Sequence, residues 1–372
     1  VQLVKFELET SFWDLAERHF GFRQETPSLR NLLIHLLVTD LAHGLREALP
    51  SAYEHLVLPP SGRHSAVICL TQWRDSASKG GSYDLISEWV GQELRVEEPL
   101  MNVSMERLME CDTFSVIEKL LLRQVRDRVL ETSETPNPAE IRALAGKRQD
   151  GHWARLTHRE DHPLFPRQTY RAAYEAMVIA SEYQALRMEL GDSLSSDHAV
   201  ALYTHYTDSL YRCDQRYRRF CESCDVAEKK GWDLLKKLRD WVEQDYSQGF
   251  LKDLSVCWGR FVDPEGATAL INAWHLDGID NQYDFFKKHV QPRLNLGENR
   301  KVFVIISDAL RYEVAEELMR ELNGKYRYEA QLSSLLGVLP SYTSLGMASL
   351  LPHQELAFND KADVLVDSRP TG

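Results

Sequence analysis

Amphipathic helical periodicity runs through residues 1–290 of this 372-residue chain and restricts what that region can fold into. Apolar side chains recur at spacings of three and four residues, which places them along one face of a helix. The clearest stripes are Leu29, Leu32, Leu33, Leu36, Leu37 and Leu41; Phe114, Ile117, Leu121, Val125 and Val129; Tyr170, Tyr174 and Met177; and Trp232, Leu235, Leu238 and Trp241. These faces predict helical bundles that pack around their own cores.

Turn-forming residues divide the helical region. The Pro-Asn-Pro sequence at 136–138 separates two groups of helices, so we expect one helical domain over residues 1–134 and a second over 135–290. Within the first domain, an apolar run at 66–70 lies between two stretches rich in Gly, Pro and Ser. This run is the candidate for a short strand in the helical half.

The pattern changes after residue 300. Residues 302–306 (VFVII) form a continuous β-branched and aromatic run, typical of a strand that is buried on both faces of a parallel sheet. Helical spacing follows over 310–322, a second helix is expected over about 343–350, and the apolar run 364–366 is a further strand candidate. This order predicts the beginning of an α/β domain over residues 301–372.

Charge and composition exclude several classes of protein. The net charge of −12 repels phosphate backbones and argues against nonspecific coating of nucleic acid. No apolar run approaches the roughly 20 residues that cross a bilayer. The six cysteines have no framework spacing, so we expect free thiols in a reducing cytoplasm and a soluble protein without membrane partners.

Two weaker patterns have ordinary structural explanations beside functional ones. Cys221 and Cys224 have the inner spacing of a zinc or redox pair, but no second pair follows, and buried cysteines commonly act as small apolar side chains. Basic residues are frequent over 212–239, with Tyr211 and Tyr217 among them, and could contact nucleic acid. On an acidic chain, a solvated basic face is the favoured interpretation.

Asp308 is the first candidate site residue, because it lies one residue past the predicted apolar strand 302–306. In an open α/β sheet, ligands bind beyond the carboxyl ends of the strands, where a carboxylate can hold a divalent cation. The alternative is that Asp308 only caps a helix that begins at Ala309. Arg311 stands where a capping box would have Glu or Gln, and this does not decide between a ligand role and a capping role for Asp308.

Thr343 is the second candidate, at the start of the predicted helix 343–350. The free N–H groups at a helix start favour a bound phosphate, and a divalent metal can activate a threonine hydroxyl as a nucleophile. The alternative is again capping of the helix, by Thr343 or by Ser341. Together, Asp308 and Thr343 predict a metal-holding carboxylate and a hydroxyl on turns at one edge of the sheet.

Two segments, VFVIISDALRYE (residues 302–313) and PSYTSLGMASLLP (residues 340–352), strongly resemble the PglZ family of the alkaline phosphatase superfamily. The helical stretch 170–222 is similar to the region before the phosphatase domain in type A PglZ proteins of type 1 BREX phage-defence systems. The resemblance implies that Asp308 is a metal ligand and that Thr343 is both a metal ligand and the nucleophile. It also implies an alkaline-phosphatase-like α/β domain after the helical bundles.

The resemblance further implies a function in bacterial anti-phage defence. The expected activity is that of a metal-dependent phosphatase or phosphodiesterase with zinc or manganese, and the expected partners are other BREX components, including the site-specific DNA methyltransferase. The alternative is a helical scaffold that assembles the BREX complex and carries a vestigial or regulatory hydrolase domain.

The chain departs from the superfamily pattern in one respect. Further Asp and His ligands are required from later strands, whereas His353 is expected at the surface and Asp363 and Asp367 have no convincing ligand role. The chain begins at Val1 without an initiator Met and ends at Gly372, soon after an apolar run. We therefore expect an internal fragment with a truncated α/β domain, which binds no metal and is inactive by itself.

Overall fold

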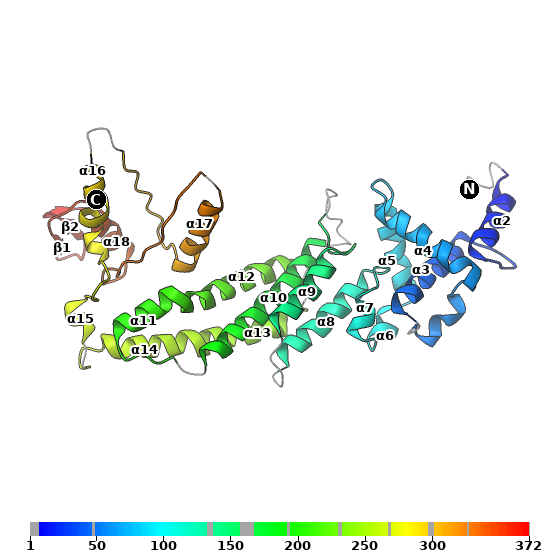
Figure 1. Ribbon diagram of the computed structural model, residues 1–372, viewed down its shortest axis with the longest axis horizontal. Helices are drawn as coiled ribbons and strands as arrows, with labels where there is room; N and C mark the ends of the chain where they lie inside the picture. Colours follow the sequence, from blue (N-terminus) through cyan, green and yellow to red (C-terminus); the bar gives the residue numbers. More distant parts are fainter. Residues whose placement is uncertain are drawn as a thin grey trace. The chain divides into compact units, whose positions relative to one another are not determined.

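The computed structural model describes residues 7–46, 49–131, 137–156, 167–191, 194–229, 233–266, 269–296, 301–325 and 327–371. They belong to two compact units, Val1–Leu186 with Tyr217–Glu243 (unit 1) and Arg187–Arg216 with Gln244–Gly372 (unit 2). Helices make up most of the chain, and strands occur near its C-terminal end (Figure 1). The predicted class, mainly helical with an α/β-type region at the end, is confirmed; the domain boundaries at residues 134 and 290 stay a prediction.

The first half of the chain contains both long and short helices. In chain order they are α2 (Glu9–Phe20), α3 (Leu29–Leu45), the 3₁₀ helix η1 (Ser51–Leu56), α4 (Pro60–Asp75), α5 (Gly80–Glu93), α6 (Glu97–Leu100), α7 (Met105–Leu108), α8 (Val116–Leu130), α9 (Pro138–Gln149) and α10 (Arg167–Leu190).

The second half continues with further helices, and its described residues include three π-helical segments. They are α11 (Ala199–His205), η2 (Tyr206–Leu210), α12 (Tyr211–Glu228), α13 (Lys236–Gln244), η3 (Asp245–Leu251), α14 (Lys252–Val262), α15 (Leu270–Ala273), the 3₁₀ helix η4 (Gln282–Asp284), η5 (Phe286–Val290), α16 (Gln291–Leu294), α17 (Tyr312–Gly324) and α18 (Thr343–Leu350). The helices predicted over 310–322 and 343–350 are α17 and α18. Among the described residues, no helix is both long and apolar enough to traverse a bilayer.

The strand predicted at 66–70 is wrong, because these residues lie within helix α4. Ala66 and Leu70 are fully buried, while Ile68 between them is 43% exposed. Burial at a spacing of four residues is the helical pattern, so the run is one turn of an amphipathic helix. Gly62 lets α4 approach α2, since a Cβ at that position would lie 1.9 Å from the carbonyl oxygen of Phe20.

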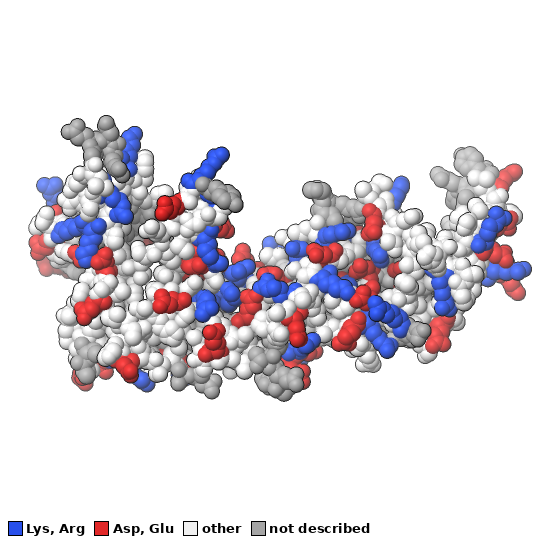
Figure 2. Space-filling model, viewed as in Figure 1, with Lys and Arg blue, Asp and Glu red and all other residues white. Residues whose placement is uncertain are grey.

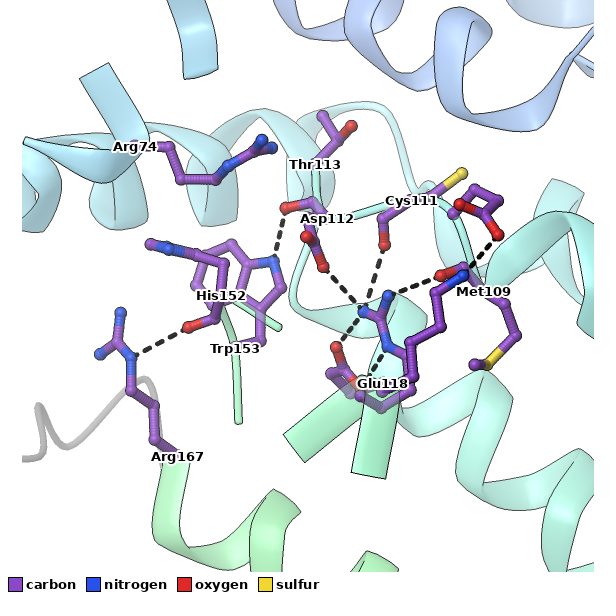
Figure 3. Close-up of polar contacts among 12 residues, drawn as sticks. Arg74, Met109, Cys111, Asp112, Thr113, Glu118, His152, Trp153 and Arg167 are labelled. Atoms are coloured by element: carbon purple, nitrogen blue, oxygen red, sulfur yellow. Dashed lines mark hydrogen bonds and ion pairs between the residues drawn. The ribbon is translucent and has the colours of Figure 1, made fainter. Parts of the chain in front are cut away.

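Unit 1 contains charged side chains buried among its apolar core residues. Glu118 of α8 is 0% exposed; it forms an ion pair with Arg148 of α9 and accepts a hydrogen bond of 2.6 Å from the Tyr174 hydroxyl. Arg148 also donates to the carbonyl oxygens of Met109, at 3.0 Å, and Cys111, at 3.2 Å (Figure 3). The cation therefore ties together helices α8 and α9 and the loop before α8.

A second buried carboxylate of unit 1 has two cationic or polar partners. Asp84 of α5 lies 2.6 Å from Nε2 of His152 and 2.6 Å from Nη2 of Arg167. Burial acts to raise the pKa of Asp84, but the hydrogen bonds and charges of His152 and Arg167 outweigh it and hold this pKa below its usual value.

Unit 2 contains a small antiparallel sheet of three strands. β1 (Leu356–Phe358) pairs with β2 (Val364–Val366), which pairs with β3 (Arg369–Pro370). The strand predicted at 364–366 is thus confirmed, although its partners are antiparallel and adjacent in sequence.

The strand predicted at 302–306 is not formed in the described structure. Its residues have no strand pairing, and Phe303 and Ile305 are 84% and 92% exposed. A strand buried on both faces requires neighbours that supply hydrogen bonds and apolar cover. Within the described residues, no strand pairs with this run. The apolar pattern of residues 302–306 therefore does not lead to a buried strand here.

The surface carries mixed charge. Lys and Arg side chains are interspersed with Asp and Glu over the face drawn in Figure 2. This mixture agrees with the ion pairs of the described residues, many of which join exposed side chains, as Arg128 and Glu140 do at 2.8 Å.

Candidate functional site

Asp308 and Thr343 lie side by side in unit 2. The Thr343 hydroxyl donates a hydrogen bond of 3.3 Å to Oδ2 of Asp308, and both residues are exposed. They line a cavity of about 510 Å³ together with Ser307, Ser341 and Met347. The structure therefore brings together the two residues that the sequence singled out, at a place that solvent and small ligands can reach.

The turn around Asp308 explains why its carboxylate faces the cavity. Oδ1 of Asp308 accepts a hydrogen bond of 3.0 Å from the N–H of Ala309, whose φ of +58° turns the chain sharply. Helix α17 begins only at Tyr312, with Arg311 as its N-cap residue and no capping side chain. The alternative that Asp308 caps a helix at Ala309 is wrong, which leaves Oδ2 directed to Thr343.

Thr343 is the first residue of α18, and its hydroxyl does not cap that helix. The N-cap residue is Tyr342, and no side chain accepts from the first turn, so neither Thr343 nor Ser341 acts as the cap. The hydroxyl of Thr343 is instead engaged with Asp308 across the cavity wall.

Gln282 of η4 holds the segment that carries Thr343. Its Nε2 donates to the carbonyl oxygen of Gly346 at 3.0 Å, and its Oε1 accepts from the N–H of Val338 at 3.3 Å. Trp274 donates in addition to the carbonyl oxygen of Gly337 at 2.6 Å. Sequence reasoning missed Gln282, because a lone glutamine in a helical region carries no signal of a contact more than fifty residues away.

The donor set of this site suits a divalent cation in type but not in number. A carboxylate and a hydroxyl are oxygen ligands of the kind that zinc and manganese accept. Four or more ligands are usual, and the described residues contain no group of three or more His, Cys, Asp or Glu side chains arranged to hold a metal ion. Asp308 and Thr343 thus fit as part of a ligand set.

The other polar residues near the end of the chain have structural contacts. Asp367 accepts hydrogen bonds from the N–H groups of Gln354, at 2.8 Å, and Glu355, at 2.9 Å, which hold its pKa below the usual value. The prediction that His353 lies at the surface is wrong: this side chain is buried, with its ring against Tyr283 and Nδ1 2.8 Å from the carbonyl oxygen of Leu351. These residues shape the hairpin and the turn after α18.

Two weaker sequence signals find ordinary explanations. Cys221 and Cys224 are free thiols, as are the other four cysteines. Burial raises the pKa of both thiols, which disfavours the thiolate that zinc or redox chemistry needs. In the basic stretch 212–239, Arg239 is paired with Asp225 and Glu228, as expected for a solvated charged face.

Comparisons with known proteins agree with the motifs. Residues 285–372 match the family model described as the BREX system PglZ alkaline phosphatase-like domain. Over 357 residues, 96% of this chain, the sequence is 35% identical to the alkaline phosphatase-like protein BrxZ of Escherichia coli O9:H4 (strain HS). Over 365 residues it is 29% identical to the alkaline phosphatase-like protein PglZ of Bacillus cereus (strain H3081.97). The chain spans 40% of the length of each relative. No solved structure matches it.

Proposed function

We propose that the protein is a hydrolase of phosphoric esters that acts in a BREX anti-phage defence system, because residues 285–372 match the model of the PglZ alkaline phosphatase-like domain and nearly the whole chain is similar to BrxZ and PglZ. The observation that carries the proposal is the hydrogen bond between Thr343 and Asp308 at the wall of an open cavity. Thr343 is the nucleophile and Asp308 a metal ligand.

The arrangement suits attack on phosphorus. Since the Thr343 proton points to Asp308, the remaining lone pairs of the hydroxyl oxygen are free for a bond to phosphorus. The start of α18 adds backbone N–H groups that favour a phosphate group at the same wall. A divalent cation, zinc or manganese, would supply the positive charge that stabilises a deprotonated hydroxyl and the phosphoryl oxygens.

The test uses the protein that contains this chain, with a phosphomonoester and a phosphodiester of p-nitrophenol as substrates and with zinc or manganese added. Thr343→Ala should lower kcat by at least about 1000-fold, because the variant lacks the hydroxyl that attacks phosphorus. Ser344→Ala is the matched control, since Ser344 is the next hydroxyl along α18 and does not line the cavity. Equal rates for the two variants would disprove the role of Thr343.

The two substrates also decide between phosphatase and phosphodiesterase. Chelation should remove the activity, and return of zinc or manganese should restore it. The 372-residue chain alone is expected to show no turnover, because its described residues supply only part of a ligand set.

The biological setting is part of the same proposal. We expect cytoplasmic action together with other BREX components, among them the site-specific DNA methyltransferase. If Thr343→Ala preserved phage defence as well as assembly, the helical region would be the functional part, as a scaffold with a vestigial or regulatory hydrolase domain.

A further inference from the structure

A buried carboxylate in the helical part of unit 2 anchors the chain just after Asp308. Asp214 of α12 is 3% exposed. The hydroxyls of Tyr206 and Tyr246 donate to its two oxygens, and the guanidinium of Arg311 lies 3.5 Å from Oδ1. Burial, followed by the neighbouring carboxylate, raises the pKa of both phenols, which keeps them protonated as donors.

Arg311 also forms an ion pair with a second buried carboxylate. Nε of Arg311 lies 3.0 Å from Oε1 of Glu313, which is fully buried, and Nη2 lies 3.4 Å from the Tyr246 hydroxyl. A buried carboxylate is tolerated only beside a cation and hydrogen-bond donors. Since one guanidinium is paired with two such carboxylates, its position is closely defined.

Tyr312, between Arg311 and Glu313, is attached to the same helices. Its ring packs against Tyr211, with ring centres 5.4 Å apart, and against Tyr206 at 6.2 Å. Its hydroxyl donates to the carbonyl oxygen of Thr207 at 3.2 Å. Arg311 and Tyr312 therefore contact η2, α12 and η3, whereas the run 302–306 before Asp308 is largely exposed and has no strand pairing in the described structure.

The segment that leads to Thr343 is held by the same helical part. Leu336 is buried against Leu270 and Leu276, and this cluster includes Tyr203 of α11 and Trp258 of α14. The N–H of Leu336 donates to the carbonyl oxygen of Asp280 at 2.8 Å. Both members of the Asp308–Thr343 pair are thus carried by segments that rest on the helices of unit 2.

We propose that Asp214, acting through Arg311, is a positioning residue that sets the place of Asp308 opposite Thr343. Asp214 touches neither residue, and it lies outside the stretch 285–372 that matches the family model. The helices before the phosphatase-like domain thereby take part in building its site. This inference rests on the proposed function.

The first test compares Asp214→Asn with Asp245→Asn in the protein that contains this chain. Asp245 is a matched control, because it forms an ion pair of 2.9 Å with Arg187 in the same helical part. Asp214→Asn should lower kcat by about 10- to 100-fold with little change in KM, and should raise the metal concentration needed for half-maximal activity. Asp245→Asn should leave kcat and the metal requirement unchanged.

A second test needs no activity. Hydrogen exchange of the 372-residue chain should become faster in peptides that cover residues 305–313 in Asp214→Asn and stay unchanged there in Asp245→Asn. Should Asp214→Asn fail to fold, Arg311→Lys replaces it: the charge is kept, but one ammonium group cannot reach Asp214 and Glu313 together.

The outcomes separate the two ideas. If Thr343→Ala keeps full hydrolysis, the proposed function fails, and the positioning role of Asp214 in catalysis fails with it. If Thr343→Ala is inactive while Asp214→Asn equals Asp245→Asn in kcat, metal requirement and exchange, only the positioning role is overturned. A lower kcat per folded molecule together with faster exchange at 305–313 supports it.

Discussion

Each unit contains a hydrogen bond from a threonine hydroxyl to an aspartate, and the two pairs differ in their surroundings. In unit 1, Thr113 donates to Asp40 at 2.7 Å, both side chains are buried, and Arg74 lies 3.7 Å from the carboxylate. In unit 2, Thr343 donates to Asp308 at 3.3 Å, and both residues are exposed at a cavity wall.

The difference shows that a hydrogen bond between a threonine and an aspartate does not by itself make a reactive site. No substrate can reach Thr113, so its bond with Asp40 contributes to stability by satisfying a buried carboxylate. The pair at Asp308 contributes little to stability and leaves a hydroxyl accessible for chemistry. Buried polar groups in unit 1 should thus be sensitive to substitution, and the site of unit 2 should tolerate it.

The largest effect on stability is expected for Glu118→Gln in unit 1. This change leaves Arg148 buried without its closest anionic partner, and breaking a buried ion pair costs about 3–5 kcal/mol. The exposed pair of Arg128 and Glu140 gives the control, since Glu140→Gln should change stability by less than about 0.5 kcal/mol. Urea unfolding monitored by circular dichroism measures both values. Similar costs for the two variants would contradict the distinction between buried and exposed pairs.

The two threonines provide the direct comparison. Thr113→Ala leaves an oxygen of Asp40 without its donor and should lower the free energy of unfolding by about 1–3 kcal/mol. Thr343→Ala should change it by less than about 0.5 kcal/mol, because its oxygen partner is open to water. A stability loss for Thr343→Ala as large as that for Thr113→Ala would mean that the Asp308 pair is structural.

Two buried carboxylates of unit 1 should give smaller effects that depend on pH with opposite sign. The pKa of Asp84 is lowered in the folded state. The ionised carboxylate therefore contributes to the free energy of unfolding above the unfolded pKa of about 3.9, and this contribution is lost as pH falls through the folded pKa. The stability lost in Asp84→Asn should therefore shrink below about pH 4.

Asp40 behaves in the opposite way, because burial raises its pKa. The contribution of Asp40 to the free energy of unfolding is fully present below the unfolded pKa of about 3.9 and decreases as pH rises through the raised folded pKa. The stability lost in Asp40→Asn should accordingly be larger in acid than at neutral pH. Unfolding curves between about pH 3 and pH 7 measure both variants, and the same trend for both would contradict the two assigned directions.

The smallest effect is expected in the apolar run of unit 2. Ile305 is 92% exposed, so Ile305→Ser should change the stability of the 372-residue chain by less than about 0.5 kcal/mol. Leu41→Ser of unit 1 is the contrast, since Leu41 is fully buried. A large loss for Ile305→Ser, seen as a lower Tm, would show that this run is covered by apolar side chains in solution.

Local patterns predicted several elements well. The spacing of apolar residues placed α17 and α18, and the run 364–366 is the strand β2. The same reasoning fails at 66–70, because this short apolar run lies on one face of helix α4 and forms no strand. It also failed at 302–306, because strand formation depends on partners that a sequence pattern does not supply.

The candidate site shows the same division. The position of Asp308 after an apolar run, the position of Thr343 before a helix, and the resemblance of both segments to one family singled out the pair. Neither the hydrogen bond between them nor the support from Gln282 and Asp214 could be read from the chain, since these residues lie far apart in sequence.

By itself, the sequence determined the helical character of residues 1–290, the motifs around Asp308 and Thr343, and the family to which they are similar. Tertiary structure alone decided that Asp308 faces Thr343, that Asp214 is paired with Arg311, and that Thr113 is enclosed while Thr343 is open. The physical reason is that periodicity and capping act over a few neighbouring residues. Burial and pairing depend on which distant segments pack together.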